Sequence, residues 1–187
     1  MAKALAGVRV IRTGIVESLH RASIVVVQGC KILFSCGDTE QLISMRSSAK
    51  PFMAIPFVEE GLHFKYGIEE DELCLMMSSH NGEKLHRNKV ESILNKGGLT
   101  VDDLKCGYHV PYFEWLLSEY VAENNEKKKQ LFHNCSGKHA GMLIYAKDKN
   151  FGLESYFLRD NLLQKLIQER IRQYIGISSE DNFKVGI

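Results

Sequence analysis

The sequence predicts an α+β protein, a class in which strands and helices occupy separate stretches of the chain. Short runs rich in β-branched residues fill residues 8–45, and stretches with helix start and stop signals follow from there to residue 176. The 187 residues are 44% hydrophobic and 25% charged, a balance typical of a globular protein with one sizeable core or two small lobes.

The amino-terminal stretch predicts an antiparallel sheet of three or four strands, packed with helices. GVRVIRTG and ASIVVVQGCKILFSCGD contain the β-branched runs, and QLISM follows them. Turns are expected at Gly29 and Cys30, and again at Gly37 and Asp38. We therefore predict a meander in which consecutive strands pair as hairpins.

Helical patterns fill most of the remaining chain. A proline near the start of residues 47–61 suits a first helical turn, and Pro56 is expected to kink that helix. Thr100 is expected to cap a short helix, and residues 124–129 are expected to form a solvated loop. The predicted helices lie within residues 47–61, 69–79, 82–98, 114–131, 137–150 and 155–176.

The last residues of the chain, NFKVGI, have the pattern of an opening strand. A strand without a continuation indicates an incomplete domain, and an edge strand at a natural terminus is the alternative. We expect residues 1–187 to form a single domain that lacks its C-terminal part.

Charge and hydropathy exclude several classes of protein. The formal net charge of +1 gives no electrostatic case for binding nucleic acid or a membrane surface. No apolar run approaches the roughly 20 residues that span a bilayer, and the N-terminus lacks the pattern of a secretory signal. We therefore expect a cytoplasmic protein whose five cysteines are free thiols.

MRSSAKP, residues 45–51, places Ser47 and Lys50 three residues apart at a predicted helix start. That spacing puts two side chains on one helix face, about 5–6 Å apart at Cβ. A serine hydroxyl becomes a good nucleophile when a nearby base takes its proton, and a lysine amine can be that base. The alternative is a capping serine followed by a solvated lysine.

A second polar stretch, MMSSHNGE, ends an apolar helix with Ser78, Ser79 and His80. Asn81 and Gly82 mark a turn there. Polar groups at this end of a buried helix either face a cleft or cap the helix, and the stretch taken alone favours capping.

HNCSGKH, residues 133–139, places Cys135 and Lys138 three residues apart at another helix start. A helix N-terminus and a nearby cation stabilise a thiolate, which can bind zinc, attack a carbonyl or act in redox chemistry. Lysine binds zinc only as the neutral amine, so His133 and His139 are the more usual ligands nearby.

Taken together, RSSAKPF, SSHNGE with His86, CGYHVP and HNCSGKHAGM, in this order, resemble the bacterial L-asparaginase II family. GIVESLHR, residues 14–21, resembles the opening strand pair of that family. The resemblance implies the fold of serine β-lactamases and penicillin-binding proteins. It also implies a zinc-containing homodimer that hydrolyses the side-chain amide of L-asparagine to L-aspartate and ammonia.

The resemblance also assigns roles to individual residues. Ser47 corresponds to the nucleophile and Lys50 to its base, while Ser79 corresponds to a second serine that works with a later lysine. Cys135 and Lys138 correspond to zinc ligands. Two further residues, Arg46 and His139, are candidate contacts to the charges of the substrate or to zinc-bound water.

Three features depart from the family pattern. The family has His-Pro where this chain has RDNLLQ, in which Asp160 is expected to cap the helix instead, and it has glutamine at the position of Met53. Family members also continue after the equivalent of VGI with Asp-Gly-Cys, whose cysteine resembles a third zinc ligand. We therefore expect the N-terminal part of an asparaginase, with an incomplete site.

Other functions remain alternatives at this point. Ser-x-x-Lys also occurs in proteins that recognise β-lactams. A glutaminase differs only by one methylene of substrate, worth about 1–3 kcal/mol of discrimination. A non-catalytic relative that acts as an interaction module is the third alternative.

Overall fold

The computed structural model describes residues 5–176, and the predicted strand NFKVGI lies outside this range. Strands and helices occupy separate stretches, which confirms the predicted α+β class. The chain divides into two compact units, Met1–Ser44 and Met45–Ile187, each of which is described by itself.

The first unit consists of two antiparallel hairpins. Strand β1 (Leu5–Arg12) pairs with β2 (Ile15–Ala22), and β3 (Ile24–Gln28) pairs with β4 (Lys31–Cys36). Thr13 and Gly14, which join β1 to β2, have φ values of 46° and 82°. Positive φ at both positions is the geometry of a two-residue type I′ hairpin turn.

The predicted meander is wrong, because β2 and β3 belong to different two-stranded sheets. Only Ser23 separates these two strands, and a tight hairpin needs about two turn residues to reverse the chain. The chain therefore continues from one hairpin into the next. Residues 41–45, which include the predicted strand QLISM, form no regular element.

The second unit is helical. Its elements are η1 (Arg46–Ala49), α1 (Lys50–Glu59), α2 (Leu62–Lys65), α3 (Glu70–Met76), α4 (Lys84–Lys96), η2 (Val101–Asp103), η3 (Glu114–Leu116), α5 (Leu117–Ala122), α6 (Glu126–Lys129), η4 (Gln130–Phe132), α7 (Ser136–Lys149) and α8 (Leu162–Ile175). Among the residues described, no helix has both the length and the apolar character needed to cross a membrane.

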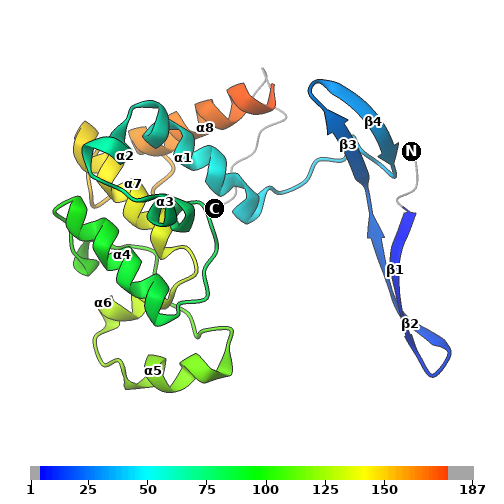
Figure 1. The fold of residues 1–187 in the computed structure, drawn as a ribbon, viewed down its shortest axis with the longest axis horizontal. Coiled ribbons are helices and arrows are strands. Elements are labelled where there is room, and N and C mark those ends of the chain that lie inside the picture. Colours follow the sequence, from blue (N-terminus) through cyan, green and yellow to red (C-terminus); the bar gives the residue numbers. More distant parts are fainter. Residues whose placement is uncertain (1–4, 177–187) are drawn as a thin grey trace. The chain divides into compact units, whose positions relative to one another are not determined.

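Helix α7 is the centre of this unit and packs against α1, α3, α4 and α8 (Figure 1). It is buried on nearly every side, including at Ala140, Leu143 and Ile144. Small residues make the close packing possible. A Cβ atom at Gly137 would lie 2.7 Å from the carbonyl oxygen of Leu75 in α3.

Several helix boundaries differ from the predictions. Helix α8 begins at Leu162, and the cap is the Asn161 side chain, which accepts the Leu163 N–H, instead of Asp160. The predicted loop at residues 124–129 contains the short exposed helix α6. The Thr100 cap is confirmed, because its hydroxyl accepts the Asp102 N–H.

Candidate active site

Ser47 lies in η1 and Lys50 is the first residue of α1, so both lie at the predicted helix start. They do not fit the alternative of a capping serine followed by a solvated lysine, because neither helix has a side-chain cap and Lys50 is buried. Lys50 is only 3% exposed. The hydroxyl that bonds the local backbone belongs to Ser48, which donates to the carbonyl of Met45. The Ser47 hydroxyl is therefore available for a partner outside its own helix.

That partner is Ser79, which follows α3. The Ser79 hydroxyl donates to Ser47 Oγ at 3.0 Å and accepts from Lys50 Nζ at 2.8 Å. Lys50 Nζ also donates to the carbonyl oxygens of Ser78 at 2.7 Å and of Asn134 at 3.5 Å. The three predicted catalytic residues are thus brought together, with the Ser79 hydroxyl between Ser47 Oγ and Lys50 Nζ.

The predicted zinc ligands lie at the N-terminus of α7 and are both half-buried. The Cys135 N–H donates to His133 Nδ1 at 3.0 Å, and its thiol lies 3.3 Å from the side-chain oxygen of Asn134. Burial lowers the pKa of Lys138, against the opposing effect of Cys135, and nearby Lys50 lowers it further.

Sequence reasoning missed a second thiol beside these two residues. Burial raises the pKa of Cys106 to about 12, with a smaller contribution from the charge of Cys135. Cys106 donates weakly to the carbonyl oxygen of Gln130 at 3.7 Å. CGYHVP was the only signal in the sequence, because the approach of residues 106 and 135 depends on the tertiary fold.

The two candidate substrate contacts differ in their surroundings. His139 Nδ1 lies 2.8 Å from the hydroxyl of Tyr156, which also accepts the Lys105 N–H at 3.0 Å. Burial lowers the pKa of His139 well below its ordinary value. Arg46 is exposed and has a left-handed backbone with φ of 46°, and its side chain makes no hydrogen bond or ion pair with any described residue.

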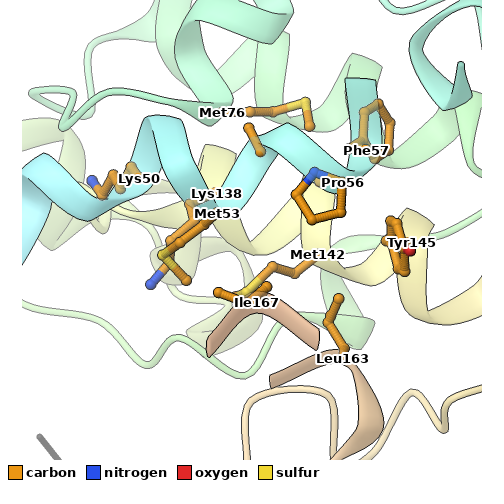
Figure 2. Close-up of a pocket in the computed structure, with 12 residues that line it drawn as sticks. Lys50, Met53, Pro56, Phe57, Met76, Lys138, Met142, Tyr145, Leu163 and Ile167 are labelled. Carbon is orange, nitrogen blue, oxygen red and sulfur yellow. The ribbon is translucent and has the colours of Figure 1, made fainter. Parts of the chain in front are cut away.

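A small apolar cavity lies behind the two lysines, between α1, α7 and α8. Figure 2 shows Lys50 and Lys138 at one end of it and Tyr145 at the other. The centre of a water molecule could move within about 20 Å³ of this cavity, so the cavity has room for about one water molecule. An amino acid cannot enter it, so a substrate would have to meet Ser47 and Ser79 on their exposed side.

The donor set for a metal is partial. Cys135 supplies a thiol, and the lowered pKa of Lys138 suits the neutral amine that a metal requires. Within residues 5–176, however, no group of three or more histidine, cysteine and carboxylate side chains is placed to hold a metal ion. The two residues fit zinc as part of a ligand set.

An α+β protein with two serine hydroxyls in a row beside a buried amine contains the groups that serine-dependent acyl transfer requires. A family model described as L-asparaginase II matches residues 8–187. The chain therefore belongs to the L-asparaginase II family, a family of amidohydrolases. The comparison with curated proteins gives no match.

Proposed function

We propose that this protein is an L-asparaginase, which hydrolyses the side-chain amide of L-asparagine to L-aspartate and ammonia. Family membership supports an amidohydrolase of this type. The observation that carries the proposal is the hydrogen-bonded series from Lys50 through Ser79 to Ser47. It joins an exposed nucleophile to a buried proton acceptor through one hydroxyl.

In the proposed reaction, both hydroxyls rotate so that Ser47 donates to Ser79 and Ser79 donates to the neutral amine of Lys50. Ser47 Oγ then attacks the amide carbon while its proton passes to Ser79, and the Ser79 proton passes to Lys50. Lys50 returns a proton through Ser79 to the amide nitrogen, which leaves as ammonia while Ser47 keeps the acyl group as an ester. Water then adds to the ester on Ser47 and gives up a proton through Ser79 to Lys50. The proton returns by way of Ser79 to Ser47 Oγ as the ester bond breaks and L-aspartate is released. Ser79 therefore works with Lys50 in both steps.

The charges of the substrate need partners at the exposed side of the site. Arg46, next to Ser47 and without a partner among residues 5–176, is available to a carboxylate. His139, whose Nδ1 is held by Tyr156, can present its other nitrogen to the substrate. These two residues are proposed to bind and orient L-asparagine.

Zinc is proposed to be held by Cys135 and Lys138, with further ligands from outside residues 5–176. When bound, it supplies a Lewis acid that orients and polarises groups of the substrate. The nucleophile in this proposal is Ser47, because acyl transfer to serine does not require a metal-bound water.

The test is ammonia release by the full-length protein with L-asparagine or L-glutamine as substrate. We expect Ser47→Ala to lower kcat at least about 10³-fold. Ser48→Ala is the matched control, because this neighbouring hydroxyl bonds only the Met45 carbonyl, and it should keep near-parental activity. Metal analysis of Cys135→Ser should show reduced zinc content.

Two outcomes would count against the proposal. Near-parental ammonia release by Ser47→Ala would mean that the nucleophile is wrongly assigned. If the zinc-loaded parent enzyme released no ammonia from L-asparagine, the proposed activity itself would be wrong.

A further inference from the structure

His80 directly follows Ser79 and is 5% exposed. Its Nδ1 atom accepts the Gly82 N–H at 3.1 Å, and its Nε2 atom lies 2.9 Å from the Ser136 hydroxyl. Since Nδ1 is an acceptor, Nε2 carries the proton and donates it to Ser136. Burial, with smaller electrostatic contributions from His86 and Lys50, lowers the pKa of His80 to about 3, which keeps the ring neutral.

Ser136 is fully buried and is the first residue of α7, directly after Cys135. Its hydroxyl accepts from His80 and donates to the carbonyl of Leu131 at 3.2 Å. The ring and the hydroxyl therefore satisfy each other completely, with no unpaired donor left between them. Such fully satisfied buried networks fix one arrangement of the segments that they join.

The same two segments meet at two further points. The His80 N–H donates to the Asn134 carbonyl at 3.1 Å. A Cβ atom at Gly82 would lie 2.8 Å from the carbonyl oxygen of Phe132, so only glycine allows this approach. Residues 78–82 and 132–136 are thus held together by side-chain and backbone contacts.

Lys50 Nζ contacts both of these segments. Its acceptors at Ser78 and Ser79 belong to one segment, and its acceptor at Asn134 belongs to the other. The distance between the segments therefore decides where the amine sits relative to Ser79. A displacement of about 1 Å in a catalytic group can lower a rate about 100-fold.

We propose that the His80–Ser136 pair positions Ser79 and the N-terminus of α7 around Lys50, so that both are positioning residues for the reaction. This inference rests on the proposed function and adds two residues that do not touch the substrate. It assigns the pair an effect on kcat in addition to any effect on folding.

The variants separate the two nitrogen atoms of His80. His80→Asn keeps an acceptor near the position of Nδ1 for the Gly82 N–H, but its side chain does not reach Ser136. His80→Gln keeps a donor near the position of Nε2 for Ser136, but it loses the acceptor for the Gly82 N–H. Ser136→Ala removes the hydroxyl, and Ser92→Ala is the matched control, because Ser92 bonds Glu72 and lies outside the site.

We expect His80→Asn and Ser136→Ala to lower kcat per folded molecule about 10- to 100-fold, with KM within about threefold of the parent. His80→Gln should recover most of the activity that His80→Asn loses, and Ser92→Ala should keep parental kcat. The double variant His80→Asn, Ser136→Ala should lose little more kcat than either single variant. Folded fractions come from unfolding curves of each variant.

A purely structural role would lower stability and leave kcat per folded molecule unchanged, and that result would overturn the proposal. Equal losses in His80→Gln and His80→Asn would also overturn it. Amide exchange gives a readout that does not depend on activity. The backbone N–H of residue 80 should exchange faster in His80→Asn and Ser136→Ala than in the parent, and unchanged protection would contradict the pairing even if the parent released no ammonia.

Discussion

Lys50 shows how much a single side chain depends on segments far from it in sequence. A buried amine is stable only when its polar atoms have partners, and three oxygen atoms surround this one. Spacing within MRSSAKP predicted that Ser47 and Lys50 would lie close together. It could not predict that Ser79 lies between them, because that contact depends on the turn after α3.

His80 makes the stability of the protein depend on pH. Its pKa is about 3 in the folded protein and about 6.5 when unfolded, so below pH ~6.5 only the unfolded chain gains the proton. Stability is therefore complete above this range and decreases as pH falls toward 3. His133, whose pKa burial lowers to about 4, acts in the same direction.

We expect His80 alone to cost about 2 kcal/mol of unfolding free energy between pH ~7 and pH ~5. Urea unfolding at several values in this range measures the slope, and carboxylates contribute little there. His80→Gln should show a shallower slope than the parent. Identical slopes for the two proteins would contradict this account.

At the scale of elements, the crossing of α3 and α7 brings the backbone of α3 against Gly137. A Cβ atom there would meet the backbone of Leu75, whereas one at Gly141 would meet the flexible end of Met76. Helical patterns predicted both helices, because caps and apolar spacing are local signals. They could not predict which glycine allows the contact, nor that Asn161 would cap α8, since both depend on the neighbouring elements.

Alanine has a helix propensity about 1 kcal/mol more favourable than that of glycine. On propensity alone, Gly137→Ala and Gly141→Ala would therefore both stabilise the protein. We expect Gly137→Ala instead to destabilise the protein by about 1–3 kcal/mol, because a backbone carbonyl cannot move aside. Gly141→Ala should cost less, since Met76 can adopt another rotamer. Urea unfolding of both variants measures their free energies of unfolding. A Gly137→Ala variant more stable than the parent would show that α3 and α7 move apart without cost and would contradict the prediction.

At the scale of the whole molecule, the first unit is unusual for its exposed apolar side chains. Val27 and Ile32, which face each other across β3 and β4, are each 60% exposed. Isolated two-stranded hairpins have little stability in water, and exposed apolar strands favour association. Composition and β-branched runs were enough to predict strands here. The pairing was mispredicted, because it depended on whether the chain reverses at Ser23.

We therefore expect the protein to associate with itself through this unit, with an apparent mass that rises between about 1 and 100 µM protein. Light scattering after size-exclusion chromatography measures it. A double Val27→Thr, Ile32→Thr variant keeps the β-branched shape and should associate at least about tenfold more weakly. Phe64→Thr, which removes an exposed side chain from α2, is the control and should associate like the parent. A parent that stays monomeric at the highest concentration would contradict the expectation.

The sequence positions of the acceptors of Lys50 also have a consequence for folding during synthesis. They lie 28, 29 and 84 residues further along the chain. When α1 and α3 have left the ribosome, Asn134 has not yet followed. If the two helices docked at that stage, one donor of the amine would have only water as its partner. Docking of α1 against α3 is therefore more favourable once the segment that contains Asn134 has also been synthesised.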